Sequence, residues 1–155
     1  MIKPKVSHLL IIVIFIAISC QEMWGDNDLG DNFSLLEGDR TEDRVIVYCN
    51  GRSAGTCYIG TFIVPIYSRH YDSTGHYAEY VETAKSNDDF IIARTLHISD
   101  MKKNYWIISK NFSIENCDKM KCDSIIQSHV IGPLDYSQFK AKQGELDIDL
   151  QFDKD

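Results

Sequence analysis

The amino-acid sequence predicts an α+β domain that is mainly antiparallel β: a meander sheet of about five to seven strands with one short C-terminal helix packed on it. Three observations carry this prediction. Residues 88–110, DDFIIARTLHISDMKKNYWIISK, join two apolar runs through a polar loop, which is typical of a β-hairpin. Residues 44–64 repeat that arrangement around a glycine-rich turn, and residues 135–144 carry the start and stop signals of a helix.

The N-terminal segment has the features of a secretory leader. Lys3 and Lys5 precede an uninterrupted apolar run of about ten residues, whereas a membrane-spanning helix needs roughly 20. The next residues, Ala17-Ile18-Ser19-Cys20, resemble the lipobox of bacterial lipoproteins, in which the cysteine is acylated and the leader is cut before it. The resemblance implies that residues 1–19 are a lipoprotein signal peptide and that Cys20 is a membrane anchor carrying a fatty acid such as palmitate.

Two other interpretations of this segment stay open. The first is an ordinary signal peptide that has a cysteine near its cleavage site by chance. The second is an uncleaved N-terminal helix, although ten apolar residues are few for a helix that spans a membrane. Gln21 follows the cysteine, in place of the aspartate that retains some lipoproteins in the inner membrane. We therefore expect a bacterial cell-envelope location, on the outer rather than the inner membrane.

The chain without its leader is strongly acidic. The leader holds two of the 16 lysines and arginines and no acidic residue, so 14 basic side chains face 23 acidic ones, a net charge of −9. Such a surface repels nucleic-acid phosphates, and membrane association must rest on the lipid anchor. We expect residues 20–32 to be an acidic tether and residues 33–155 to be a single globular domain, with a first short strand at Phe33–Leu36.

A calcium loop is a weaker interpretation of the tether. Asp26, Asp28 and Glu37 occupy the first, third and twelfth positions of that motif, but Gly30 falls one place too early.

Four cysteines remain besides Cys20. In an oxidising compartment they favour two disulfides, and three connectivities are possible. The local pairs are preferred: Cys49 and Cys57 lie at the bases of the hairpin turn, and Cys117 and Cys122 enclose a short loop. A four-thiolate zinc site is the alternative, with less regular spacing than zinc knuckles have.

The turn of this hairpin also spells G-x-S-x-G at residues 51–55, the motif of a hydrolase nucleophile elbow. An elbow needs a strand before it and a helix after it. Because a strand is predicted on both sides, we interpret Ser53 as a turn residue.

The loop at residues 65–76 is the candidate ligand site, because it contains Tyr67, His70, Tyr71 and His76. Two histidines six residues apart have no third ligand at a recognisable spacing, so no metal site is predicted. Residues 77–83 alternate well enough to form a strand that leads into the hairpin of residues 90–109. Trp106 lies in that hairpin and is expected in the core.

The C-terminal part contains the clearest helix signal. Asp135 is a cap, Gln138 completes a capping box, and Leu134 with Phe139 forms a hydrophobic staple. The helix is predicted to span residues 136–143 and to end at Gly144. We expect it to pack across one end of the sheet. Residues 124–130 are predicted to form a helical turn that ends at Gly132-Pro133. Residues 147–155 are predicted to form an edge strand, whose charged residues discourage pairing with other chains.

The motifs FIIAR, YWIIS and IGPLDYSQF resemble a pattern in small bacterial lipoproteins and exported proteins of unknown function. The match covers roughly residues 80–146. It implies a hairpin followed by a Gly-Pro-Leu turn and a capped helix, and it carries over no active-site residue and no cofactor.

These features favour a lipid-anchored, non-enzymatic interaction or accessory module whose partner is another envelope protein. Two alternatives stay open. One is a small-ligand binder that uses the loop of residues 67–80. The other is a hydrolase that uses one of the four histidines of the mature domain, His70, His76, His97 or His129.

Overall fold

The computed structural model describes residues 26–153 except 54, 113 and 115–117, so the leader, Cys20 and Cys117 lie outside the described residues. The chain is mainly antiparallel β, as predicted, but its strands form two four-stranded sheets and not a single meander sheet. The first sheet has the order β1 (Asp26–Gly30), β2 (Phe33–Leu36), β3 (Val45–Ser53), β4 (Thr56–Val64). The second has the order β5 (Glu79–Ser86), β6 (Phe90–His97), β7 (Lys103–Ser109), β8 (Val130–Leu134). The described helices are the 3-10 turn η1 (Thr41–Asp43) and the α-helices α2 (Tyr67–His70), α3 (Lys119–Ser128) and α4 (Tyr136–Glu145).

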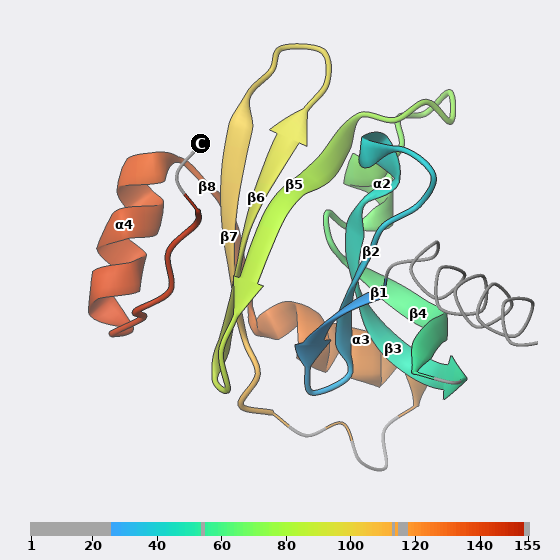
Figure 1. Cartoon of the computed structure of the whole chain (residues 1–155), viewed down its shortest axis with the longest axis horizontal. Coiled ribbons are helices and arrows are strands. Elements are labelled where there is room, and N and C mark those ends of the chain that lie inside the picture. The colour runs from blue at the N-terminus through green and yellow to red at the C-terminus, as the bar shows by residue number, and fades with distance from the viewer. Residues whose placement is uncertain (1–25, 54, 113, 115–117, 154–155) are drawn as a thin grey trace, which may run out of the picture.

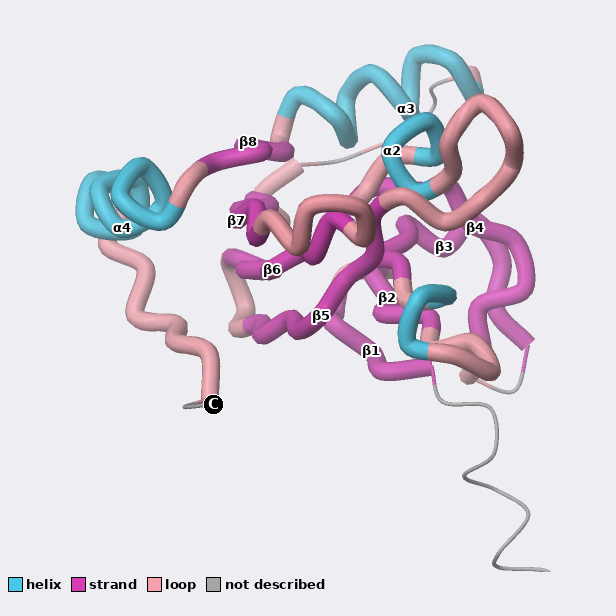
Figure 2. Tube along the Cα trace, turned by 90° about the horizontal axis from the view of Figure 1, so that it is seen from above, coloured by secondary structure: helices cyan, strands magenta, loops and turns pink. Residues whose placement is uncertain are grey.

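The elements are arranged in three layers, with α4 on one side of the sheet β5–β8 and the sheet β1–β4 on its other side (Figures 1 and 2). The main core lies between the two sheets and includes Phe33, Ile46, Ile91 and Ile108. A second core, with Ile107 and Phe139 at its centre, fills the space between β5–β8 and α4. The outer face of β1–β4 carries a third, smaller buried cluster, in which Leu36, Cys57 and Phe62 pack against Val45, Val47 and Cys49.

Apolar side chains on both faces of the strands explain why one open sheet does not form. In β6, Ile91 faces the main core whereas the adjacent Ile92 faces α4, and both are fully buried. A strand of this kind needs cover on both faces. The segment that contains α2 carries the chain from β4 to β5, and a second meander packs on the first.

The predicted hairpins are confirmed. Ile91 pairs with Ile108 and Ala93 with Trp106, in antiparallel register between β6 and β7. Trp106 is 4% exposed, as expected for a core residue, and its Nε1 donates a hydrogen bond to the Thr95 hydroxyl at 2.9 Å.

The first sheet extends into the segment expected to be a tether, because residues 26–30 form β1. Asp31 and Asn32 make the two-residue turn to β2 with φ values of 49° and 66°, which aspartate and asparagine tolerate better than most residues. Leu29 is the only aliphatic side chain of this strand, and it is buried in the main core. That burial supplies the apolar contact that a free tether would lack.

The predicted capping box of α4 is confirmed. Asp135 accepts a hydrogen bond from the Gln138 amide at 2.9 Å, and the Gln138 side chain accepts one from the Asp135 amide at 3.0 Å. Gly144 is not the stop, since α4 continues to Glu145. The helix covers a face of the sheet instead of its end, because Phe139 packs against Ile92 and Ile107.

Two other C-terminal predictions were wrong. Residues 146–153 form no strand; their alternating Ile148, Leu150 and Phe152 pack beside α4 against the sheet. The helical turn predicted at residues 124–130 is present as the end of α3, but Gly132-Pro133 does not terminate it. This dipeptide lies within β8, an edge strand, where a proline is tolerated. The preceding helix, α3, is longer than predicted because Asp118 caps it by accepting from the Lys121 amide at 2.9 Å.

The predicted disulfide between Cys49 and Cys57 is present, with a Cα–Cα distance of 5.6 Å. The two residues are not directly opposite each other, because Cys49 pairs with Gly60 and Cys57 with Arg52; irregularities around Gly51 shift the register. Cys122 is also disulfide-bonded. Its pairing with Cys117 stays a prediction, since Cys117 lies outside the described residues. Within the described part of the chain, no helix combines the length and apolar character required to cross a membrane.

Candidate functional site

Three of the four candidate ligand residues, Tyr67, His70 and Tyr71, come together in α2 and just after it. Their ring centroids lie 5.1 Å apart for Tyr67 and Tyr71 and 4.4 Å apart for His70 and Tyr71. Phe62 of β4 lies 5.7 Å from both Tyr67 and His70, and Tyr77 lies 5.2 Å from Tyr71. We call these five residues the aromatic cluster.

The fourth candidate, His76, does not join the cluster. It lies in an exposed turn, where its Nδ1 is 2.9 Å from the Thr74 hydroxyl and its backbone amide donates to Asp72. The exposed Asp72 side chain accepts three hydrogen bonds within this turn. His76 is therefore part of the local structure that closes the loop.

His70 is the buried member of the cluster, with 1% of its surface exposed. Its Nδ1 lies 2.8 Å from the carbonyl oxygen of Glu79, which can only accept, so Nδ1 carries the proton and donates. Burial among aromatic rings lowers the pKa of His70 below its ordinary value of 6.5, although the bond to Glu79 and the Asp43 carboxylate act in the opposite direction. His70 is therefore neutral at pH 7.

Acidification is expected to destabilise the fold through His70. Between its lowered folded pKa and 6.5, the unfolded chain binds more protons than the folded chain, so stability falls as the pH falls through this window. Urea unfolding measured from about pH 7 to about pH 5 should show this slope. The slope should be weaker in His70→Phe, which fits the ring cluster without titrating, and retained in the exposed control His76→Asn. An unchanged slope in His70→Phe would assign the effect to another group.

Asp43 of η1 lies beside the cluster and accepts a hydrogen bond from the Tyr77 hydroxyl. This bond lowers the pKa of Asp43 and raises the pKa of Tyr77 to about 12, because it stabilises the carboxylate and the protonated phenol together. Asp43 is 34 residues away from Tyr77 in the sequence, so no local pattern indicates the pair.

A buried polar network holds α2 in place. Glu79 is 1% exposed, and its Oε2 accepts from Arg69 Nε at 2.8 Å and lies 2.6 Å from Arg69 Nη2. Its Oε1 accepts from the Asn104 amide at 2.8 Å and from the Thr95 hydroxyl. The guanidinium of Arg69 also lies over the Trp106 ring, 5.6 Å from its centroid. These contacts fix α2, and with it the aromatic cluster, to the end of the sheet β5–β8.

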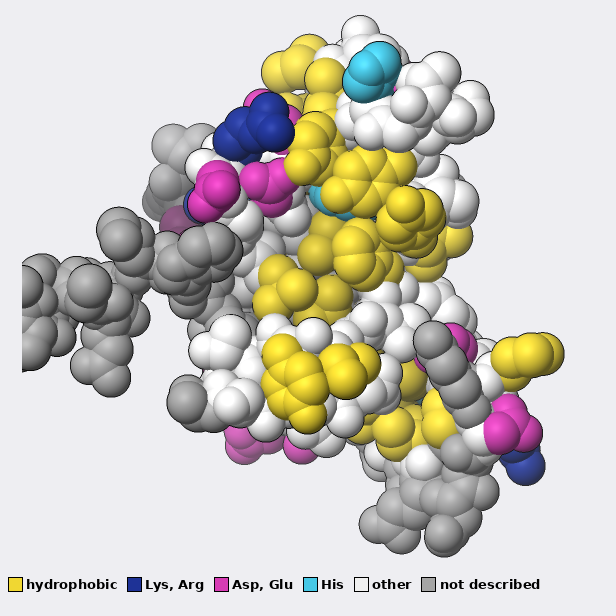
Figure 3. All heavy atoms as spheres, turned by 90° about the vertical axis from the view of Figure 1, so that its right-hand side faces the viewer, with side chains coloured by type: hydrophobic (Ala, Val, Ile, Leu, Met, Phe, Trp, Pro, Cys, Tyr) yellow, Lys and Arg dark blue, Asp and Glu magenta, His cyan; other side chains and the backbone are white. Residues whose placement is uncertain are grey.

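The aromatic cluster borders a cavity of about 290 Å³ on the outer face of β1–β4. Its walls come from β2, β3, β4 and α2, and the apolar lining residues are Leu36, Val45, Cys57, Phe62 and Tyr71. Figure 3 shows hydrophobic side chains gathered across this side of the molecule. Tyr67, whose ring lies beside Phe62 and Tyr71, is 65% exposed. Tyr58 and Ile59 of β4 are also exposed, by 65% and 55%. We use the name aromatic face for this cavity and Tyr67 together with the exposed β4 residues Tyr58 and Ile59.

The other sequence motifs form no catalytic or metal site in the described residues. Ser53 of the G-x-S-x-G motif ends β3 one turn before β4, so a strand lies on both sides as predicted. The calcium-loop positions belong to the hairpin β1–β2, where Asp28 pairs with Arg52 at 3.4 Å. Across the described ranges, no group of three or more histidine, cysteine, aspartate or glutamate side chains is placed to hold a metal ion.

The histidines do not form a hydrolase triad in the part of the chain that is described. His97 comes nearest, with Asp100 at 2.8 Å and Ser99 at 3.2 Å, but both contacts are made to the same ring nitrogen, Nδ1. A triad requires the acid and the nucleophile on opposite ring nitrogens. His129 contacts the Ile125 carbonyl oxygen at 3.0 Å and the ring of Phe112, and acts as a C-terminal contact of α3.

Comparisons with protein-family models, with curated proteins and with solved structures found no match to this chain. The geometry of the aromatic face is therefore the observation on which a function must rest.

Proposed function

We propose that this chain is a lipid-anchored protein of the bacterial cell envelope that binds an extended segment of another envelope protein along strand β4. The proposal rests on one observation above all: β4 is an uncharged edge strand beside an exposed apolar face. Acylation of Cys20 and an outer-membrane address, both inferred from the lipobox resemblance, supply the location.

The edges of the two sheets differ in their protection. Edge strands usually carry charges or proline that prevent pairing with other chains. Within the described structure, β1 contains two aspartates, β5 contains glutamates and a lysine, and β8 contains Pro133. Strand β4, TCYIGTFIV, has nine residues and neither a charge nor a proline.

One end of β4 is covered by α3. The Thr61 hydroxyl donates to Asp123 at 3.1 Å, and Gln127 donates to the Phe62 carbonyl at 3.5 Å. Residues 58–60 are exposed. A peptide that pairs with this portion would gain backbone hydrogen bonds from the edge, and alternate side chains would reach the cavity at Phe62.

The anchor limits where such a partner can be. Five residues lie between Cys20 and Asp26 at the start of β1, and the six extended steps that join the two residues span at most about 20 Å. A lipid on Cys20 therefore keeps the domain close to the bilayer, and the partner is a membrane protein or a protein held near the membrane.

Photo-cross-linking tests this function. The full chain, with a benzophenone amino acid in place of Tyr58, is expected to form discrete adducts in its own cells. Adding Ile59→Lys should weaken them by roughly tenfold or more, because it places a charge in the apolar contact. The same benzophenone at Met120, which is 84% exposed on α3, is the control position and should give none of these adducts.

Identical adducts at both positions, or adducts insensitive to Ile59→Lys, would contradict the proposal. Ile59→Lys should change the free energy of unfolding by less than about 0.5 kcal/mol, which separates loss of binding from loss of folding. In the same cells Cys20→Ala should release the chain from the membrane fraction, and unchanged association would contradict the anchor.

Binding of a small apolar ligand is the second candidate, and the cavity of about 290 Å³ favours it. In that case a compound from a metabolite library should raise the melting temperature of the purified chain, and no protein adduct should form at position 58.

A further inference from the structure

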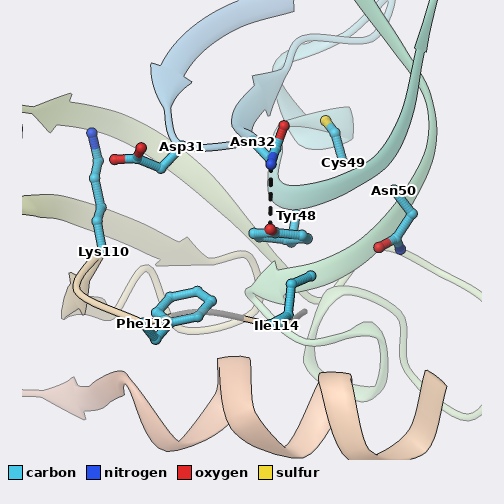
Figure 4. A pocket seen from close by; sticks show the side chains of 8 residues that line it. All are labelled: Asp31, Asn32, Tyr48, Cys49, Asn50, Lys110, Phe112 and Ile114. Atoms are coloured by element: carbon cyan, nitrogen blue, oxygen red, sulfur yellow. Dashed lines mark hydrogen bonds between the residues drawn. The ribbon is translucent and has the colours of Figure 1, made fainter. Parts of the chain in front are cut away.

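A second cavity, of about 480 Å³, lies beside strand β3, and none of its lining residues lines the cavity of the aromatic face. Ligand pockets in proteins have volumes of roughly 300–1,000 Å³. It is open to solvent and is lined by residues of the β1–β2 turn, β3 and the segment after β7, as Figure 4 shows. Lys110 and Asp31 lie at one end of this cavity, and Phe112 and Ile114 lie below the Tyr48 ring.

Lys110 is unusual because its side chain is buried without a carboxylate partner. It is 9% exposed, and Nζ donates to the Asn87 carbonyl oxygen at 2.6 Å. No carboxylate oxygen of the described residues lies within 4.0 Å of this ammonium. A lysine ammonium has three donors, and lysine is rarely buried unless it is paired. The described chain therefore leaves capacity on Lys110 for an anionic group.

Asp31 supplies the opposite charge at the same end of the cavity (Figure 4). It lies in the two-residue turn between β1 and β2, and its carboxylate forms no hydrogen bond or ion pair with a described residue. Asp31 and Lys110 are more than 4.0 Å apart, so they do not neutralise each other by direct contact. A ligand that carries both charges could therefore place its anionic group on Lys110 and its cationic group on Asp31.

Aromatic and aliphatic side chains form one wall of the cavity, and Asn32, Cys49 and Asn50 complete the lining. The rings of Tyr48 and Phe112 lie 6.1 Å apart, and the Tyr48 hydroxyl accepts a hydrogen bond from Asn32 at 3.3 Å. Tyr48 is thus fixed, and Ile114 lines the same wall. This wall fits an apolar group a few atoms away from the charged end.

We propose that this cavity binds a free α-amino acid with an apolar side chain, with its carboxylate on Lys110, its ammonium on Asp31 and its side chain against Tyr48 and Phe112. Other ligand classes fit less well. A simple anion would be repelled by Asp31, and a neutral sugar would leave Lys110 without a counter-charge. A peptide has its two terminal charges at opposite ends, so it cannot satisfy both residues at once.

Calorimetric titration of the full chain, purified in detergent, with L-leucine tests the proposal. L-leucinamide lacks the carboxylate and N-acetyl-L-leucine lacks the ammonium, and each is expected to bind roughly 10- to 100-fold more weakly than leucine, the loss typical of a hydrogen bond to a charged group. Glycine, which lacks the side chain, should also bind more weakly.

Two variants assign each charge to its residue. Lys110→Met should bind leucine and leucinamide equally, while Asp31→Asn should bind leucine and N-acetyl-leucine equally. Asp39→Asn, an exposed acid in another loop, should keep the discrimination of the unmodified chain, and so should Ile59→Lys at the aromatic face.

The proposal is overturned if neither L-leucine nor L-phenylalanine binds, or if leucinamide and N-acetyl-leucine bind as well as leucine. It is also overturned if Lys110→Met and Asp31→Asn bind leucine and still discriminate as the unmodified chain does. Because Asp31 is an exposed turn residue and asparagine tolerates the same backbone conformation, Asp31→Asn keeps the test valid even if Lys110→Met does not fold.

Discussion

Replacement of Phe139 by alanine is expected to lower the free energy of unfolding by about 3–5 kcal/mol. Phe139 is 2% exposed and is the apolar anchor of α4, with its ring stacked 5.1 Å from Tyr105 and 5.8 Å from Phe152. Its removal leaves a void between the helix and β5–β8, because Ile92 and Ile107 cannot follow the lost ring without moving the sheet. Typical domains have only about 5–15 kcal/mol of stability in total, so the variant should be only marginally folded at room temperature.

Urea unfolding followed by tryptophan fluorescence measures this loss, since Trp106 lies on the inner face of the same sheet. Tyr136→Ala is the matched control: Tyr136 belongs to the same helix but is 59% exposed. It should cost less than about 1 kcal/mol. Equal losses in the two variants would mean that the second core does not stabilise the domain as its burial indicates.

Replacement of Arg69 by methionine is the second large effect, with an expected loss on the order of 3 kcal/mol. The change keeps most of the apolar stem of the side chain but leaves the Glu79 carboxylate, 1% exposed, without its cation. Thr95 and Asn104 still donate to Oε1, but no described cation would then balance the charge. The partial exposure of Arg69 places the expected loss at the lower end for broken buried pairs.

The effect should be visible in two measurements, the urea midpoint and the near-ultraviolet circular dichroism of Tyr67 in α2 and Tyr71 just after it. Arg69→Lys, which keeps a cation, should lose less than Arg69→Met. Lys142→Met breaks an exposed pair with Glu145 and should cost less than about 1 kcal/mol. A loss in Arg69→Met no greater than that of Lys142→Met would show that the network does not hold α2.

Two distinct binding activities are proposed for this chain, one at the aromatic face and one at the cavity beside Lys110. Cys49 connects them, because its disulfide to Cys57 borders the cavity of the aromatic face while Cys49 itself lines the other cavity. Both sites belong to the sheet that begins six residues after Cys20. One test measures cross-linked adducts in cells and the other measures amino-acid binding by calorimetry, so either can fail without affecting the other.

Several elements could be predicted from the sequence because their causes are local. The hairpin β6–β7 follows from two apolar runs and a polar loop, and the cap of α4 follows from Asp135 and Gln138 three residues apart. The pair Cys49–Cys57 needs only a strand on each side of one turn. In the candidate site, Tyr67, His70 and Tyr71 could be recognised because α2 and the residue after it hold them within five positions.

The remaining features depend on contacts between distant segments. A count of strands cannot distinguish one meander sheet from two, since the local patterns are the same; the choice depends on burying both faces of β3, β6 and β7. The alternation of Ile148, Leu150 and Phe152 near the C-terminus predicts a strand, but these side chains instead pack against the sheet beside α4. Asp43 reaches Tyr77, and Lys110 reaches the turn at Asp31, because segments far apart in the sequence pack together.

The sequence by itself thus determined the hairpins, the helix cap, the first disulfide and the acidic charge, because each follows from neighbouring residues or from composition. Only the tertiary structure decided how the strands divide between two sheets, that the uncharged strand β4 lies at a sheet edge, and which charges lie at one cavity. Those outcomes depend on the packing of apolar faces between segments far apart in the chain, and local patterns carry no information about that packing.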